Sequence, residues 1–145
     1  RRSSDLEIAM LNDDAYHDDP LKAGDSRYLH RGDMDWKAAE KRGDAESPQG
    51  RVFQAVKRLE ALRKEHVAFD SAAEVRLVPG LPNSLLGIER VLSGERLIAV
   101  FNFSEFAQNA LPGDSGTYLD LWTGKTAPAA DITVPAGGFR WLVQE

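Results

Sequence analysis

The stretch LLGIERVLSGERLIAVFNF, residues 85–103, decides the fold of this chain. Two apolar runs, 85–92 and 96–103, flank the pair Ser93-Gly94, a residue combination that is frequent in tight turns. Apolar side chains fill both alternating sets of the second run: Leu97, Ala99, Phe101 and Phe103 on one face, and Ile98 and Val100 on the other. Because both sets are apolar, the sequence predicts a central strand that is buried on both sides.

Further short runs with a period of two lie before and after this stretch. The predicted strands cover residues 75–78, 85–92, 96–103, 117–122, 131–134 and 139–143. Turn residues separate them, at Pro79-Gly80, Pro82-Asn83, Pro112-Gly113-Asp114 and Gly137-Gly138. This even spacing predicts an antiparallel β-sandwich or meander over residues 71–145.

One amphipathic helix is predicted before the strands. Ser47 is a suitable N-cap, and Pro48 suits the first helical position. The apolar stripe consists of Val52, Phe53, Val56, Leu59 and Leu62, and the opposite face carries Arg51, Lys57, Glu60, Arg63 and Lys64. We expect the helix to end near residues 66–69 and to pack its stripe on its own sheet or on a second copy of the chain, since leaving it in water forgoes about 1.5–3 kcal/mol per large side chain.

Residues 1–47 are rich in charged and small residues and show no lasting period. Long segments of this kind are usually functional loops or disordered. Such a segment has no role in a small sheet protein, which indicates a piece cut from a larger fold.

The composition excludes several classes of protein. The chain has 145 residues, a net charge of −5 and no cysteine. The acidic balance disfavours nucleic acid as a partner, and no apolar run is long enough for a membrane helix. The absence of cysteine excludes disulfides and thiol nucleophiles and fits a cytoplasmic location.

Other polar and aromatic residues could in principle bind metal or sugar, but structural roles are favoured for them. Asp13, Asp14, Asp18 and Asp19 lack the spacing of a calcium loop, and His17, His30 and His66 are too scattered to share a metal ion, so no metal site is predicted. Tyr118, Trp122 and Trp141 could form a sugar-stacking platform, yet each lies in an alternating apolar run that predicts core packing.

A long front segment resembles the last active-site loop of the amylosucrase and sucrose hydrolase group of the α-amylase superfamily. The matching runs are Leu11-Asn12-Asp13-Asp14-Ala15-Tyr16, Asp18-Asp19-Pro20-Leu21-Lys22 and Asp25-Ser26-Arg27-Tyr28-Leu29-His30-Arg31. Later landmarks are Leu62-Arg63, Val100-Phe101-Asn102-Phe103-Ser104-Glu105, Asp120-Leu121, Gly124-Lys125-Thr126 and Trp141-Leu142. The resemblance runs from about residue 7 to the end, with Tyr28 in place of an expected tryptophan and Asp5-Leu6-Glu7 in place of an expected Gly-Asp-Glu.

The resemblance implies an α+β fragment: the last loop and helix of a (β/α)8 barrel, followed by an antiparallel β-sandwich C-terminal domain. Residues 1–70 would end the catalytic barrel and residues 71–145 would form the C-terminal domain. A complete barrel takes about 250 residues, so this chain cannot contain one.

The resemblance further implies a retaining enzyme that transfers glucosyl groups from sucrose to an α-glucan or to water. Retention needs two carboxyl groups about 5 Å apart. In this family they precede the last loop, so no catalytic residue is assigned here and the chain alone is expected to be inactive. Arg27 matches the arginine that pairs with an upstream aspartate at the floor of the donor glucose pocket.

No cofactor is implied, and the expected partners are sucrose, an α-glucan and the preceding portion of the barrel. The alternative reading is a non-catalytic carbohydrate-binding or structural β-sandwich module. Binding of a maltooligosaccharide by the chain alone would favour the module.

Overall fold

The computed structural model of the chain describes residues 12, 14–30, 34–111 and 113–145. These residues fall into two compact units, Arg1–Ala61 and Leu62–Glu145, which are described separately below.

Before the long helix α2, the described residues of the first unit form only short helices. The 3-10 helices η2 (Asp14–Asp18), η3 (Ser26–His30) and η4 (Lys41–Gly43) accompany one α-helical turn, α1 (Trp36–Glu40). Asp35 caps α1 by accepting a 2.9 Å hydrogen bond from the Ala38 amide. None of these helices exceeds five residues, which explains why the sequence shows no period here.

The long helix α2 (Pro48–Glu65) begins where the sequence predicts. The Ser47 hydroxyl accepts a 2.9 Å hydrogen bond from the Gly50 amide, so the predicted N-cap is confirmed. Gly50 is required at this position, because a Cβ added there would lie 1.8 Å from the Asp44 carbonyl oxygen. The chain enters the helix through a turn that only glycine accommodates.

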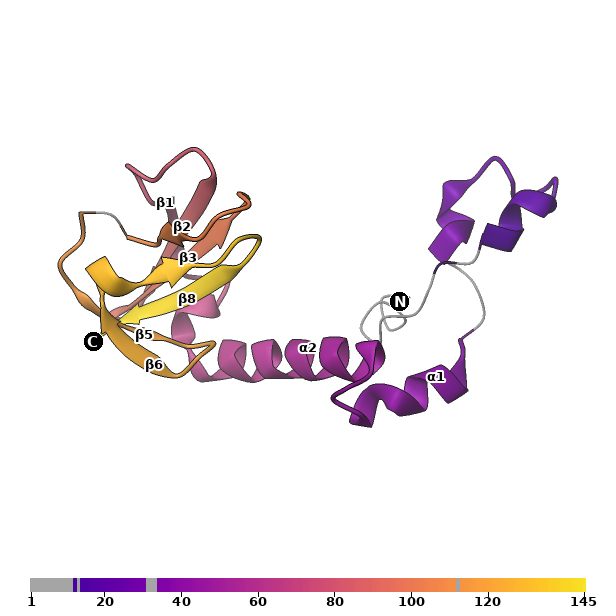
Figure 1. The fold of residues 1–145 in the computed structure, drawn as a ribbon, viewed down its shortest axis with the longest axis horizontal. Helices are drawn as coiled ribbons and strands as arrows, with labels where there is room; N and C mark the ends of the chain where they lie inside the picture. Colours follow the sequence, from indigo (N-terminus) through magenta and orange to yellow (C-terminus); the bar gives the residue numbers. More distant parts are fainter. Residues whose placement is uncertain (1–11, 13, 31–33, 112) are drawn as a thin grey trace. The chain divides into compact units, whose positions relative to one another are not determined.

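The described residues of the second unit form eight strands in two antiparallel sheets, the larger of which is labelled in Figure 1. The larger sheet has the order β1-β2-β3-β8-β5-β6, and the smaller one pairs β4 with β7. The strand bounds are Glu74–Leu77 (β1), Leu85–Leu92 (β2), Glu95–Asn102 (β3), Gln108–Asn109 (β4), Thr117–Asp120 (β5), Lys125–Pro128 (β6), Thr133–Val134 (β7) and Phe139–Gln144 (β8). The 3-10 helices η5 (Val67–Phe69) and η6 (Ala129–Asp131) precede β1 and β7. The predicted antiparallel sheet in this part of the chain is confirmed.

The predicted central strand is also confirmed. β3 lies between β2 and β8, and Leu97, Ile98 and Val100 are fully buried. Phe103 is an exception to the prediction: it follows the end of β3 and is 75% exposed. The alternation stops there because the side chain of Asn102 holds the chain in a turn, accepting hydrogen bonds from the Ser104 amide and hydroxyl.

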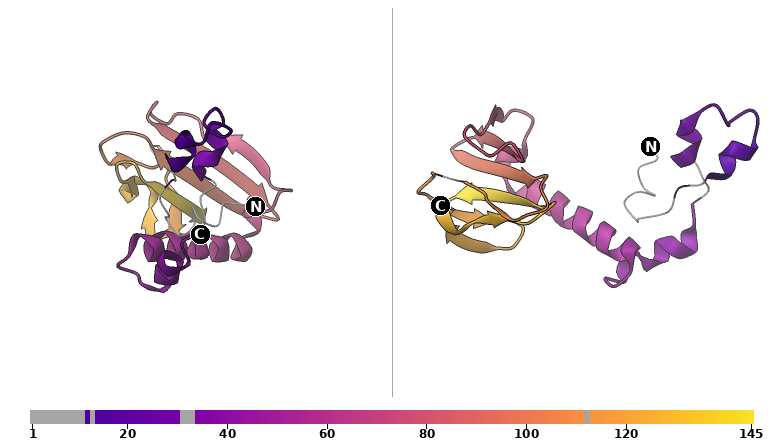
Figure 2. Two further views of the ribbon diagram at one scale, coloured as in Figure 1. Left: turned by 90° about the vertical axis from the view of Figure 1, so that its right-hand side faces the viewer. Right: turned by 45° about the horizontal axis from the view of Figure 1, so that its top comes forward.

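Each face of the six-stranded sheet has its own apolar cluster. The first, here called the layer face, packs against the two-stranded sheet and includes Ile98, Val100, Tyr118, Val134 and Leu142. The second, here called the helix face, includes Leu97, Ala99, Leu121 and Trp141, and Ala68, Phe69 and Leu62 pack on it. Figure 2 shows the strands side by side from two further directions. The expected docking of the helix on the sheet therefore holds for Leu62, at the end of α2.

Most strand boundaries differ from the predictions by one or two residues, since β1 covers 74–77, β3 covers 95–102 and β8 covers 139–144. β5 ends at Asp120, and Trp122 lies in the following turn. The backbone amide of Trp122 donates a 2.9 Å hydrogen bond to the Asp120 carboxylate. Asp131 belongs to η6 rather than to a strand. Strands β4 and β6 were not predicted.

Among the described residues, no helix is long and apolar enough to cross a membrane.

Candidate functional site

The segment Asp14–His30, which carries the resemblance, is held together by its own aspartates. Asp19 accepts a 2.9 Å hydrogen bond from the Leu21 amide and pairs with Lys22 Nζ at 3.0 Å. The hydrogen bond from the Leu21 amide, followed by that from Lys22, lowers the pKa of Asp19. The Lys22 ammonium lies 5.8 Å from the centre of the Tyr28 ring. These contacts fold the polar segment into a defined loop without an apolar core.

Arg27, the candidate substrate-binding residue, stands at the start of η3 and pairs with Asp25 of the same loop. Its Nε and Nη2 atoms donate to the two Asp25 carboxylate oxygens at 2.8 and 2.7 Å, and its backbone amide donates to Asp25 Oδ1 at 3.0 Å. These hydrogen bonds raise the pKa of Arg27 above its ordinary value. The Arg27 side chain remains 74% exposed.

This pairing occupies one edge of the guanidinium. A guanidinium carries five N–H donors in a rigid planar fork, so Nη1 and the second hydrogen of Nη2 lie on the far side from Asp25. Asp25 thus fixes the plane of the Arg27 guanidinium, and the pairing leaves the remaining N–H donors for another acceptor. An arginine in this arrangement can donate hydrogen bonds to a second carboxylate.

The aspartates and histidines of the sequence do not gather into a metal site in the described part of the chain. Asp13 lies outside the described residues, and so does the side chain of His30. The rings of Tyr16 and His17 lie 4.0 Å apart. His66, at the end of α2, instead faces a carboxylate, with Nδ1 3.3 Å from Glu95 Oε2.

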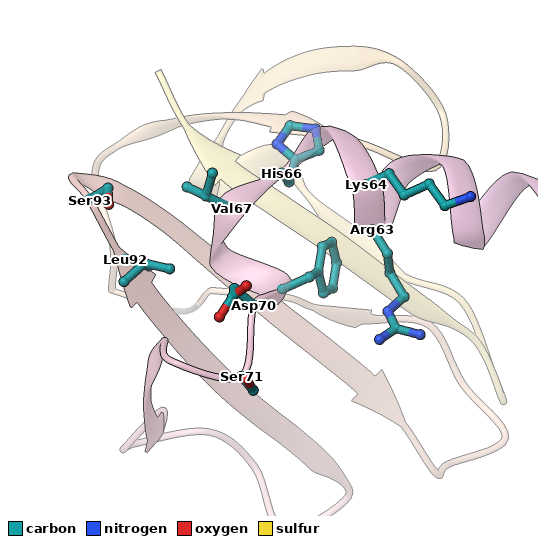
Figure 3. Close-up of a pocket in the computed structure, with 9 residues that line it drawn as sticks. Arg63, Lys64, His66, Val67, Asp70, Ser71, Leu92 and Ser93 are labelled. Carbon is teal, nitrogen blue, oxygen red and sulfur yellow. The ribbon is translucent and has the colours of Figure 1, made fainter.

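Glu95 and Arg90 together fasten the segment after α2 to the helix face. Glu95 Oε1 accepts a 3.1 Å hydrogen bond from the Ala68 amide, and Arg90 donates to the carbonyls of Ala68 and Asp70 at 2.6 and 2.7 Å. An open hollow of about 580 Å³ lies beside this segment. Its lining comes from the end of α2, from η5 and from the end of β2, and includes Arg63, Lys64, Asp70, Ser71, Leu92 and Ser93 (Figure 3).

The aromatic residues divide between the two faces of the sheet. Tyr118 is fully buried on the layer face, which confirms the core role predicted for it. Trp141 packs on the helix-face cluster, 4.6 Å from Phe69 and 5.8 Å from Phe139 between ring centres. Trp122 lies 5.6 Å from Phe139. These half-buried rings form one continuous row, here called the aromatic row.

A polar network at one end of the sheet was not predicted from the sequence. Arg96 donates to Glu89 at 2.5 Å, to the Tyr118 hydroxyl at 2.8 Å and to Gln144 at 3.1 Å. The Tyr118 hydroxyl in turn donates to Asp114 at 2.8 Å. These partners are up to 48 residues apart in sequence, and only the strand order β2-β3-β8-β5 brings them together.

No protein-family model matches the chain. Solved structures of amylases do share its fold. A variant of AmyP in complex with maltotriose is 21% identical, with a TM-score of 0.59 over 70% of this chain and 22% of that one. An Anoxybacillus α-amylase is 14% identical, with a TM-score of 0.53 over 65% of this chain and 22% of that one. A maltogenic amylase from S. marinus is 19% identical, with a TM-score of 0.51 over 66% of this chain and 12% of that one.

The likeness covers most of this chain but only about a fifth or less of each of these enzymes. At such identities it shows the fold alone. The chain is thus a small α+β fragment whose antiparallel sheet resembles the C-terminal domains of amylase-type enzymes.

Proposed function

We propose that this chain is the C-terminal portion of a retaining enzyme that transfers glucosyl groups from sucrose to an α-glucan or to water. Two independent features support the proposal. The sheet unit has a fold found in solved amylases, and the sequence of the front loop resembles the last active-site loop of the amylosucrase and sucrose hydrolase group. The fold supports the broad class of enzyme, whereas the preference for sucrose is carried by the loop sequence.

The observation that carries the site is the orientation of Arg27 by Asp25. A donor pocket needs a rigid floor, and an arginine held along one edge can donate hydrogen bonds from its remaining N–H groups to an upstream carboxylate. In this proposal Arg27 binds at the pocket floor and Asp25 is a positioning residue. The two carboxyl groups that perform the chemistry would lie in the preceding barrel portion, so the 145-residue chain by itself should release neither glucose nor fructose from sucrose.

The experiment is kinetic and uses the longer enzyme that carries this segment. Arg27→Ala should lower kcat/KM for sucrose by at least about a hundredfold, since a charged hydrogen-bonding partner is lost from the pocket. Asp25→Asn should lower it less, and Arg27→Lys should not restore it because lysine lacks the planar fork. Arg51→Ala is the control: Arg51 is also exposed and also makes a local hydrogen bond, to the Glu46 carbonyl at 2.6 Å.

Two results would contradict the proposal. Normal sucrose turnover by Arg27→Ala would remove the pocket role. Turnover of maltooligosaccharides but not of sucrose by the unmodified enzyme would leave the amylase fold in place and remove the sucrose assignment.

The alternative function, carbohydrate binding without chemistry, has some support from the aromatic row. Tyr118 cannot take part, because it is fully buried on the opposite face. Trp122, Phe139 and Trp141 are half-buried and adjacent, as a stacking platform would require. Saturable quenching of tryptophan fluorescence by maltoheptaose, lost in Trp122→Ala, would favour this second function.

A further inference from the structure

The edge strand β1 has an unusual distribution of side chains. Cross-strand partners share a face of a sheet, and the register pairs Val75 with Arg90 and Leu77 with Ile88. Ile88 in turn pairs with Ala99 of the helix face, so Val75 and Leu77 belong to that face. Glu74, Arg76 and Glu89 lie on the opposite face, in register with Ile98.

The apolar side chains of this corner are exposed. Val75 is 55% exposed, Leu77 73% and Leu86 37%, because the segment that covers the helix face extends over Leu97 and Trp141 rather than over β1. Arg90 lies opposite Val75 on this face, and its guanidinium donates to two backbone carbonyls. The corner thus exposes three aliphatic side chains on one face, beside an arginine that is already hydrogen-bonded, and an exposed apolar patch of this kind is typical of an interaction surface.

β1 also ends the sheet. It pairs with β2 only, and β1 and β6 lie at opposite edges of the six-stranded sheet (Figure 1). All four residues of β1 are exposed, and β1 carries neither a proline nor a bulge that would block a further strand. The backbone edge of β1 is therefore open to an additional antiparallel partner.

The geometry points to a second copy of this chain as that partner, with β1 pairing antiparallel to β1 across a two-fold axis perpendicular to the sheet. Directly opposite residues in an antiparallel pair place their side chains on the same face of the sheet. In a pairing of β1 with itself, two opposite residues must therefore be an even number of positions apart in the sequence. In the register that places Val75 opposite Val75, Glu74 of each copy faces Arg76 of the other. The Val75 and Leu77 side chains of both copies then form one apolar strip.

The neighbouring register is less favourable, because it places Arg76 opposite Arg76. Charge complementarity thus selects a single register, and the two-fold symmetry closes the assembly at a dimer with a continuous twelve-stranded sheet. Because β1 has only four residues, we expect the contact to be smaller than the roughly 800 Å² per partner of a stable interface, and the dimer to be weak and dependent on concentration. This inference does not depend on the proposed function.

The test uses charge reversal and analytical ultracentrifugation of the 145-residue chain over a hundredfold range of concentration. Arg76→Glu alone, or Glu74→Arg alone, should weaken dimerisation by about tenfold or more, since two opposite-charge contacts become like-charge contacts. The double variant Glu74→Arg with Arg76→Glu restores opposite charges across the axis and should dimerise within about threefold of the unmodified chain. Circular dichroism at low concentration checks that each variant is folded.

A cross-link gives a second, independent readout, because the chain contains no cysteine of its own. Val75→Cys should form a covalent dimer under mild oxidation, whereas Thr126→Cys on the opposite edge strand β6 should not. A chain that is monomeric at every concentration would overturn the inference. A dimer whose affinity is unchanged by the single charge reversals would also overturn it. Such a result would favour dimerisation through the apolar stripe of α2.

Discussion

Asn102 shows how one amide side chain can end a strand and join two sheets. It is 2% exposed, and its Nδ2 lies within hydrogen-bond distance of the carbonyls of Phe106, Val134 and Pro135, at 2.7 to 3.1 Å. Its Oδ1 accepts from the amide and hydroxyl of Ser104. The side chain therefore connects the end of β3 to β7 and turns the chain away from the sheet.

Asn102→Ala should destabilise the second unit by about 2–4 kcal/mol, because one buried carbonyl, two partly buried carbonyls and one amide lose their partner at once. Urea unfolding followed by tryptophan fluorescence measures this loss. Asn83→Ala is the control: Asn83 is an exposed asparagine in a turn, and its replacement should change the free energy of unfolding by less than about 0.5 kcal/mol. A loss below about 1 kcal/mol in Asn102→Ala would show that water replaces these hydrogen bonds.

The stability of the second unit should fall in acid through Asp114. Hydrogen bonds from the Gly116 amide at 2.7 Å and from the Tyr118 hydroxyl at 2.8 Å lower the pKa of Asp114. The unfolded chain binds this proton at a higher pH than the folded one, so the contribution is present above the ordinary aspartate pKa of about 4 and is lost as pH falls through the lowered value. Asp114→Asn should be less stable at pH 7 and less sensitive to acid, as measured by urea midpoints from pH 7 to pH 2.5.

Tyr118 should produce the opposite dependence in alkali. Burial of its hydroxyl, together with its hydrogen bond to Asp114, raises the pKa of Tyr118 above the ordinary value for tyrosine. The unfolded chain then loses this proton first, so stability is intact below about pH 10 and declines as pH rises through the raised pKa. Tyr118→Phe should flatten this decline between pH 9 and pH 11.5. An equally steep decline in Tyr118→Phe would assign it to other groups.

At the scale of the element, α2 depends on how its first turn is closed. The Ser47 hydroxyl lies 2.9 Å from the Gly50 amide and 2.8 Å from the Asp44 carbonyl, so it joins the helix to the preceding turn. Ser47→Ala should cost the helix end about 0.5–2 kcal/mol. Hydrogen exchange should show a two- to thirtyfold loss of protection at residues 50–52, whereas Ser71→Ala, at an exposed serine outside the helix, should leave them unchanged. Unchanged protection in Ser47→Ala would mean that the helix starts without its cap.

The elements that could be predicted from the sequence are those with a long, consistent period. β2 spans the predicted residues 85–92, and α2 begins after the predicted N-cap. β4 was missed because two residues cannot show a period, and β6 because it follows Gly124 and contains Pro128, which are turn residues. Phe103 was misplaced because alternation continues in the sequence after the strand has ended at Asn102.

The candidate site shows the corresponding limit of sequence analysis. The resemblance singled out Arg27, and the structure places it in a loop ordered by local hydrogen bonds. Its pairing with Asp25 could not be predicted, because an arginine can reach many carboxylates at similar spacing and the choice depends on the loop backbone. The Arg96 network was missed for a different reason: it requires the strand order, which the sequence does not give.

At the scale of the whole molecule, all the residues of the two apolar clusters belong to the second unit. The layer-face cluster begins at Val78, and the helix-face cluster begins at Leu62. The hydrogen bonds from Glu95 and Arg90 to the segment after α2 also lie within this unit. The end of α2 and η5 thus belong, by packing, with the sheet.

A shortened chain of residues 62–145 should therefore fold by itself, with a single cooperative transition and a Tm within about 5 °C of the corresponding transition in the whole chain. A chain of residues 71–145, cut at the domain boundary suggested by the family resemblance, loses Leu62, Ala68 and Phe69 from the helix face and exposes Leu97 and Trp141. Burying a large apolar side chain contributes about 1.5–3 kcal/mol, so the Tm of this shorter chain should fall by at least 10 °C. Calorimetry of the two chains measures the difference. Equal stability would mean that the contacts of residues 62–70 with the sheet do not stabilise it. The domain boundary of the fold would then lie at residue 70, as the family resemblance implies.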